Sequence, residues 1–262
     1  MHDTRSVRFL PVVFAVLALP ALAQAERLVD AREVARGDFL GPQYSPDGRE
    51  ILLTASQLRG LYVLGAGSVR ALTDDAEAGV HARWTSDGSI RYRAQRGGTR
   101  SDLIIGRDRT IKPAIAPAPL AFTQDDRMYV VDRTGRTARI GSGDRFFGAV
   151  VAPDGDKVVF QGLTTGLYLY VRSSGALRYI GPGTAPAWSP DSTRIAYEVT
   201  EDDGHAIVAS DLFVYTIAGD RAEPITTTEK VIERRPTFAP NGSDLAFDDN
   251  TGGVFVGHLE AR

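Results

Sequence analysis

The sequence predicts an all-β fold, a six-bladed β-propeller, on the basis of two observations. A short motif recurs, in which an apolar or aromatic residue precedes a turn of the type Ser-Pro-Asp-Gly and a strand-like run follows. The copies are about 40, 38, 29, 37 and 50 residues apart, and a period near 40 with several strands per unit is typical of propeller blades. The motif residues that precede the turns are Tyr44, Trp84, Phe122, Val151, Trp188 and Phe238.

Each copy is expected to form a β-hairpin. In the first copy, Pro46 presets φ for a turn, Asp47 can bond its own backbone, and Gly48 accepts a positive φ. The apolar run 51–53 then supplies the second strand. One such sheet cannot bury both of its faces alone, so we expect the motif residues to pack between neighbouring blades.

The remaining strands are read in chain order from apolar runs. Blade one covers about residues 41–75, and blade three is irregular, with room for three strands. The expected third and outer strands are 61–64 and 69–72 in blade one, 103–105 and 110–111 in blade two, 128–131 and 137–140 in blade three, 167–171 and 177–180 in blade four, and 212–217 and 222–226 in blade five.

Blade six ends with its third strand at 254–258 and has no outer strand of its own. Residues 27–30 resemble residues 223–226, so an N-terminal strand could pair into the last blade and leave no open edge. The alternative is a loose segment over 26–40 with a short helix at AREVAR. We favour closure by the N-terminal strand.

The first 25 residues are typical of a secretory signal peptide. Arg5 and Arg8 form a basic region, residues 9–19 are largely apolar, and two small-x-small cleavage sites end near Ala25. A membrane anchor is the alternative, but the apolar run is too short to span a bilayer and Pro20 interrupts it. We therefore predict a signal peptide at 1–25, a propeller at 26–262, and a periplasmic or secreted monomer with no stable membrane anchor.

Composition narrows the classes of partner. Loss of the leader, with Asp3, Arg5 and Arg8, would change the formal charge from −3 to −4, which argues against nucleic acid or an anionic membrane as the main partner. The chain has no Cys, so disulfides and thiol chemistry are excluded. The fold is expected to depend on its apolar core alone.

The repeats resemble those of the TolB-like propellers. The resemblance rests on residues 44–51, YSPDGREI, on residues 188–195, WSPDSTRI, and on the third strand 211–215, DLFVY. It implies a six-bladed periplasmic propeller that serves as a platform for an envelope or secreted protein or peptide. About 15 residues separate the leader from the first repeat, so we expect no additional N-terminal domain.

Catalytic and metal motifs were sought in turn. Neither the nucleophile elbow G-x-S-x-G nor the zinc motif H-E-x-x-H occurs. The mature chain has three histidines, His81, His205 and His258, which fall in different blades. The motif aspartates also belong to different blades, so a role in turns is favoured over a shared calcium site. We predict no metal, no cofactor and no catalytic residues.

Charged loops at the channel entrance are the candidate binding surface. Blade two contributes arginines around Gly97-Gly98, and blade five contributes acids, so blades on opposite sides of the ring could give one face a basic and an acidic side. Ordinary solvated charge is the alternative. The candidate residues are His81, Arg83, Arg93, Arg96, Arg100, Glu201, Asp202, Asp203, Arg234 and Arg235.

Two functions follow from this surface. The main prediction is a non-enzymatic scaffold that binds a protein or peptide at its channel face. The alternative is a propeller enzyme or small-ligand binder, for example a lyase acting on a sugar, with a His/Arg cluster at the channel mouth. His81, Arg83 and Arg235 within reach of one ligand would favour the alternative.

Overall fold

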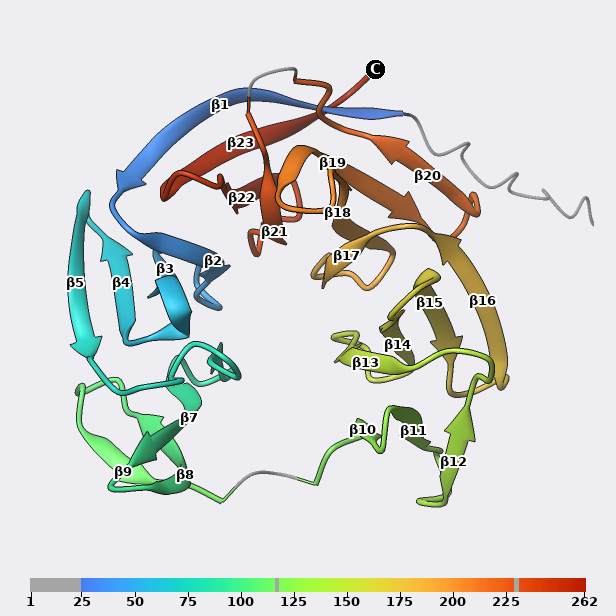
Figure 1. Cartoon of the computed structure of the whole chain (residues 1–262), viewed down its shortest axis with the longest axis horizontal. Helices are drawn as coiled ribbons and strands as arrows, with labels where there is room; N and C mark the ends of the chain where they lie inside the picture. The colour runs from blue at the N-terminus through green and yellow to red at the C-terminus, as the bar shows by residue number, and fades with distance from the viewer. Residues whose placement is uncertain (1–24, 116–117, 229–230) are drawn as a thin grey trace, which may run out of the picture.

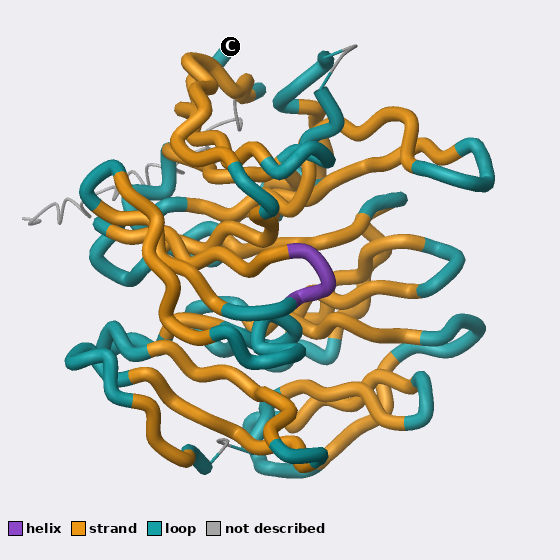
Figure 2. Tube along the Cα trace, turned by 60° about the vertical axis from the view of Figure 1, so that its left-hand side comes forward, coloured by secondary structure: helices purple, strands orange, loops and turns teal. Residues whose placement is uncertain are grey.

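The computed structural model describes residues 25–115, 118–228 and 231–262. Within them, six sheets are arranged as blades around a central axis (Figure 1), which confirms the predicted six-bladed β-propeller. Turned by 60°, the chain shows strands running between the two faces of the ring, with turns and loops at their ends (Figure 2). All but the last residue of the predicted signal peptide lies outside the described residues.

Neighbouring strands in each blade are antiparallel, and five of the six blades have four strands. Blade one contains β2 (Phe39–Tyr44), β3 (Glu50–Ala55), β4 (Leu61–Gly65) and β5 (Ser68–Thr73), and blade two β6 (Arg83–Trp84), β7 (Ile90–Arg96), β8 (Thr99–Ile105) and β9 (Ile111–Pro113). Blade three contains β10 (Ala121–Gln124), β11 (Arg127–Val131) and β12 (Thr137–Ile140), and blade four β13 (Phe146–Val151), β14 (Lys157–Gly162), β15 (Gly166–Val171) and β16 (Ala176–Gly181). Blade five contains β17 (Thr184–Trp188), β18 (Arg194–Asp202), β19 (Ile207–Thr216) and β20 (Arg221–Pro224). A single 3₁₀ turn, η1 (Ser56–Leu58), follows β3, and no helix in the described part of the chain is long and apolar enough to cross a bilayer.

Blade six contains the two ends of the described chain. Its strands β21 (Arg234–Phe238), β22 (Asp244–Asp248) and β23 (Gly253–Ala261) are completed by β1 (Glu26–Arg36), which lies outside β23 (Figure 1). The register joins Leu28 to Leu259 and Arg36 to Gly253. The N-terminal closure is therefore confirmed, and AREVAR lies in a strand instead of the alternative helix.

Neighbouring blades bury their motif residues between them. Trp188 of blade five packs with Val159 and Leu167 of blade four, and its indole N–H donates to the Val150 carbonyl at 2.9 Å. The Trp84 indole of blade two bonds the Gln43 carbonyl of blade one in the same way, at 3.1 Å. Phe122 differs, because it stacks on Tyr129 of its own three-stranded blade with ring centroids 5.4 Å apart.

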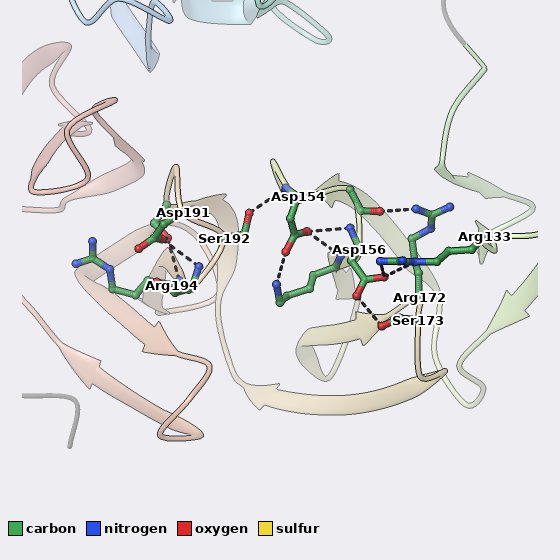
Figure 3. Close-up of polar contacts among 12 residues, drawn as sticks. Arg133, Asp154, Asp156, Arg172, Ser173, Asp191, Ser192 and Arg194 are labelled. Atoms are coloured by element: carbon green, nitrogen blue, oxygen red, sulfur yellow. Dashed lines mark hydrogen bonds and ion pairs between the residues drawn. The ribbon is translucent and has the colours of Figure 1, made fainter. Parts of the chain in front are cut away.

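The motif aspartates serve as turn residues, as predicted. Asp47 accepts a hydrogen bond from the Ser45 hydroxyl at 2.7 Å, which lowers the pKa of Asp47. Some turns also bond the next blade, since the Asp154 N–H donates to the Ser192 hydroxyl at 3.0 Å (Figure 3). Figure 3 also shows Asp156 with Ser173 and Arg133, which belong to the same face of blades three and four.

Candidate functional site

Four inner strands contain the same irregularity near the channel. In β2, β13, β17 and β21 the register shifts so that two residues of the inner strand face one residue of the second strand. The first residue of each bulge has a positive φ, which glycine adopts without strain. These bulge residues are Gly41, Gly148, Ala185 and Arg235, with φ of 63°, 65°, 50° and 49°.

At three of these four bulges, a polar side chain of the preceding blade accepts a hydrogen bond from the N–H of the bulge residue. The acceptor for Gly41 is Asp248 at 3.0 Å, and the acceptor for Arg235 is Glu198 at 2.6 Å. Gln161 accepts the N–H of Ala185 at 3.3 Å. Each acceptor ends an otherwise apolar run of the second strand, three residues after the partner of the motif residue. We call this the clasp position, and its occupants are Thr54, Arg93, Gln161, Glu198 and Asp248.

The clasps of blades five and six are carboxylates with arginine partners. Arg234 donates to Glu198 at 2.8 Å, and Arg235 donates through Nε to Asp248 at 2.9 Å. The side chains of Glu198 and Asp248 are only 1% and 0% exposed, whereas that of Arg235 is 30% exposed. Solvent can therefore reach Arg235, whereas Asp248 is covered and is paired with the guanidinium.

The two carboxyl groups are tuned in opposite directions. Burial raises the pKa of Asp248 to about 6, and the bond from Arg235 offsets only part of this effect. Burial also acts to raise the pKa of Glu198, but bonds from Arg234, the Arg235 N–H and Thr184 outweigh it and lower that pKa. Carboxyl groups that neighbouring environments drive apart in pKa are suited to different roles in proton transfer.

A third buried acid, Glu233, directly precedes Arg234 in the chain. Glu233 is buried, burial raises its pKa, and its Oε1 accepts the Thr228 hydroxyl at 2.7 Å. Within residues 25–115, 118–228 and 231–262, its Oε2 and the Nε of Arg234 are buried without a hydrogen-bond partner. Most buried polar atoms in folded proteins have a hydrogen-bond partner, so these two require an explanation, and a role at a functional site is one.

His81 occupies the position in blade two that Arg235 has in blade six. Each lies three residues before its motif residue, Trp84 or Phe238, as Gly41 lies three residues before Tyr44. Burial lowers the pKa of His81, and the charges of Arg93 and Arg83 lower it further. The imidazole is therefore neutral near pH 7, and it can accept a proton or a hydrogen bond.

The predicted basic loop is a hairpin whose arginines are largely neutralised. Its turn is Gly97-Gly98, with φ of 56° and 82°. Arg93, Arg96 and Arg100 form ion pairs at 3.1, 2.6 and 3.0 Å. Their respective partners are Asp102, Asp75 and Glu77. The basic side of the predicted polarised face is thus weaker than the sequence suggested.

The predicted acidic loop lies across the ring from that hairpin, in blade five (Figure 1). Glu201 and Asp202 end β18, and Asp203 accepts the N–H groups of His205 and Ala206, each at 2.9 Å. Among the described residues these three acids form no ion pair. They remain solvated charges at the tip of a long hairpin.

The structure separates the predicted residues into groups. Arg234 and Arg235 join Glu198 and Asp248, while His81 and Arg83 belong to blade two. No hydrogen bond connects the two groups in the part of the chain that the structure describes. Glu198 and Asp248 were not among the predicted residues, although the sequence contains a signal for them: a polar residue ends an apolar run at the same place in blades four, five and six.

No group of three or more His, Cys, Asp or Glu residues in the described ranges is arranged to hold a metal ion. Charged and polar groups of the clasps are instead paired with arginine and backbone N–H groups.

Among the comparisons with known proteins, one solved structure with a TM-score above 0.5 supports the propeller fold. No protein-family profile matches the chain. A gluconolactonase from Xanthomonas campestris aligns with a TM-score of 0.62 at 12% identity, over 89% of this chain and 91% of that one. An oligogalacturonate lyase from Vibrio parahaemolyticus aligns with a TM-score of 0.45 at 13% identity, over 86% and 79%. A putative TolB from Agrobacterium tumefaciens aligns with a TM-score of 0.40 at 17% identity, over 91% and 88%.

These comparisons correct the predicted function. The structure with the TM-score of 0.62 is an enzyme, which contradicts the main prediction of a non-enzymatic scaffold. The alternative, a propeller enzyme or small-ligand binder, agrees better with this neighbour. A likeness at 12% identity shows the fold alone, so the argument for chemistry must come from the residues at the channel.

Proposed function

We propose that the protein is a propeller enzyme that binds a small anionic sugar derivative, such as a sugar acid, at the channel mouth. The observation that carries the proposal is Arg235. It is a partly exposed arginine with a strained backbone, held between Glu198 and Asp248. Backbone strain and buried, shifted carboxyls together mark candidate functional sites.

The shape of the channel mouth supports a small ligand. Blade one, which contains Gly41, lies between blade six, which contains Arg235, and blade two, which contains His81 (Figure 1). A Cβ atom built at Gly41 meets no other atom within 4 Å. The space that a side chain at Gly41 would enter is therefore open.

The chemistry favours a carboxylate on the ligand. A guanidinium binds a carboxylate through two parallel hydrogen bonds, as Arg235 binds Asp248. A ligand carboxylate that takes this place would free Asp248. Because Arg235 lowers the pKa of Asp248, withdrawal of the guanidinium would raise that pKa further and favour uptake of a proton by the carboxyl group. We expect proton abstraction or activation of water on a sugar acid, with His81 as the second polar contact. The signal peptide predicted at 1–25 supports a periplasmic or secreted site of action.

Calorimetry with a panel of ligands tests the proposal. Glucuronate, galacturonate and gluconate are expected to bind saturably, while glucose, which lacks the carboxylate, is expected to bind at least tenfold more weakly. Arg235→Gln should weaken the binding of the acids at least tenfold. Arg133→Gln, which removes an exposed arginine from the Asp156 pair away from the channel, is the matched control.

Loss of the fold must be separated from loss of the site. Circular dichroism should show that Arg235→Gln is folded, and His81→Asn provides a second variant that leaves the buried ion pairs intact. Proton NMR of the mixtures would then report any turnover. Equal binding of glucose and the acids, or acid binding that both variants leave unchanged, would refute the proposal.

A further inference from the structure

One boundary between neighbouring blades is not sealed by an apolar core. Clusters of buried apolar side chains join blades one and two, three and four, four and five, five and six, and six and one. Within residues 25–115, 118–228 and 231–262, no such cluster joins blade two to blade three, and no strand of one packs along a strand of the other (Figure 1). We call the facing sides of blades two and three the open seam.

The seam is open because the described part of blade three lacks an inner strand. β10 lies against β13 of blade four as the second strands β18 and β22 lie against the inner strands β21 and β2. The Asp126 carbonyl in the β10–β11 turn accepts the Phe146 N–H at 2.8 Å, so this turn lies at the starting end of β13. The turn that follows an inner strand lies at the finishing end instead. β10 therefore holds the place of a second strand, and no described strand fills the place inside it.

The inner edge of β10 has unpaired backbone groups. The Leu120 carbonyl accepts the Val131 N–H at 2.8 Å, and the hydrogen-bonded pairs of an antiparallel ladder recur at every second residue. Ala121 and Thr123 lie between those pairs, so their N–H and C=O groups point away from β11. Neither residue forms a backbone hydrogen bond to a described residue on that side. A free strand edge of this kind can accept an added strand.

The side of blade two that faces the seam is basic. Ile90 and Tyr92 of β7 pack on blade one, so the side chains that alternate with them point toward the seam. The basic residues on this side are Arg83, Arg91, Arg93, Arg100 and Lys112. Arg93 and Arg100 pair with Asp102 and Glu77. The other three form no ion pair within the described residues, although Arg91 donates to the Ile115 carbonyl.

Blade three adds two arginines and an aromatic pair to the seam. Met128 of β11 packs on blade four, so its neighbour Tyr129 points toward blade two. Phe122 stacks on Tyr129, and Arg127 and Arg139 lie on the same side of the sheet. Both arginines are exposed and form no ion pair with a described residue. The open seam therefore combines a free strand edge with an excess of positive charge.

We propose that the open seam binds an extended acidic peptide, which adds to β10 as the inner strand of blade three. The peptide backbone pairs with the free N–H and C=O groups of Ala121 and Thr123. Its side chains alternate between two surroundings. One set faces the arginines of blade two and is acidic, and the other faces Ala149 and Val151 of blade four and is apolar. The free edge favours a peptide over other anionic polymers, which have no backbone that could complete the sheet.

The test compares three capped peptides on the full mature chain. A short peptide in which glutamate and valine alternate is expected to bind saturably, measured by fluorescence anisotropy. The same peptide with lysine in place of glutamate should bind about tenfold more weakly or worse, because the arginines repel it. A glutamate–valine peptide with a methylated backbone should lose affinity to a similar degree, because it cannot complete the sheet. Amide hydrogen exchange at Thr123 should slow when the first peptide is bound.

Variants of the strand edge assign the binding to β10. Thr123→Pro removes the N–H that points away from β11 and leaves the pairs with β11 in place, so it should weaken binding of the glutamate peptide about tenfold. Thr123→Ala keeps that N–H and is the matched control, with an affinity close to that of the unchanged chain. Circular dichroism should show that both variants are folded.

Variants of charge assign the binding to the side of blade two. Arg83→Glu with Arg91→Glu should weaken binding of the glutamate peptide about tenfold or more. Arg32→Glu with Arg49→Glu also reverses two exposed arginines, but they belong to blades six and one, so this control should change the affinity little. Arg235→Gln should leave peptide binding unchanged, so this proposal and the proposed function can fail separately.

Several results would overturn the proposal. The glutamate peptide could fail to bind, or it could bind no better than the lysine peptide, which would mean that the arginines do not select the charge. Binding that Thr123→Pro leaves unchanged would mean that no strand is added to β10. Dextran sulfate that binds as tightly as the glutamate peptide and displaces it would assign the basic surface to anionic polymers in general.

Discussion

Blades five and six differ from blade two in how far the charged residue at the clasp position is buried. Their clasp residues Glu198 and Asp248 are buried and face arginines. The clasp residue of blade two is Arg93, which forms a 3.1 Å pair with its side chain 45% exposed. One repeat position thus supports a buried ion pair at one side of the ring and a solvated one at another.

The difference shows that the contribution of ion pairs to stability and to function need not follow their number. An exposed pair contributes at most about 1 kcal/mol, since water competes for both charges. A buried pair contributes little more, but removal of one partner leaves an unpaired charge and costs about 3–5 kcal/mol. Among the charged residues discussed, substitutions at the clasps of blades five and six should therefore reduce the stability of this propeller most.

The largest effect is expected from Arg235→Met. This change leaves the Asp248 carboxyl buried without its guanidinium partner, so the free energy of unfolding should fall by about 3–5 kcal/mol, measured by urea titration. Arg96→Met in blade two is the matched control, with a loss of at most about 1 kcal/mol. Losses of similar size at the two sites would abolish the contrast between the blades.

The next effect is expected from Gln161→Glu in blade four. The clasp there has no arginine partner, so the new carboxylate would be buried and unpaired, at a cost of about 1–3 kcal/mol near neutral pH. The loss should shrink as the pH falls, because protonation removes the charge. Urea titration at neutral and acidic pH measures both parts, and a loss that does not depend on pH would point to packing instead.

Stability should also depend on pH through Asp248. Its pKa is about 6 in the folded chain and about 3.9 when unfolded, so the folded state binds more protons between these values. The stabilising contribution is complete below about pH 4 and is lost as the pH rises to about 6. Asp248→Asn should remove this decline, which is measured as the difference between the unfolding curves of the two proteins. An identical pH profile in both would mean that Asp248 titrates normally.

The smallest effects are expected in the hairpin of blade two. Arg100→Gln should change the free energy of unfolding by less than about 0.5 kcal/mol, because the arginine side chain is 67% exposed. Arg96→Gln should cost more, up to about 1 kcal/mol, since Asp75 is mostly buried and also accepts the Tyr92 hydroxyl. A double-mutant cycle with Asp75→Asn isolates the pair, and coupling above about 2 kcal/mol would place it with the buried pairs.

The repeat motif predicted the ring well because each copy has local turn chemistry that does not depend on distant contacts. The 29-residue spacing that follows Phe122 predicted the three-stranded blade, and the likeness between residues 27–30 and 223–226 predicted the closure. Pairing across blades was beyond such reasoning. Asp75 and Glu77 come before the second motif, and only the folded chain brings them to Arg96 and Arg100.

The sequence predicted only half of the residues of the candidate site. Arg234 and Arg235 were identified because two adjacent arginines before an inner strand are conspicuous. Glu198 and Asp248 were not, since one acid after an apolar run resembles the ordinary polar end of a strand. Their importance arises from the bulge in the next blade, whose free N–H group requires an acceptor.

The sheet that joins β1 to β23 also sets the order in which this molecule can mature. Arg27 and Glu260 are 233 residues apart and form a 2.7 Å ion pair, so that sheet unites the earliest and the latest described strands to leave the ribosome. Contacts of such long sequence separation form slowly. The ring therefore cannot close during synthesis, and the nascent chain stays open until β23 has emerged.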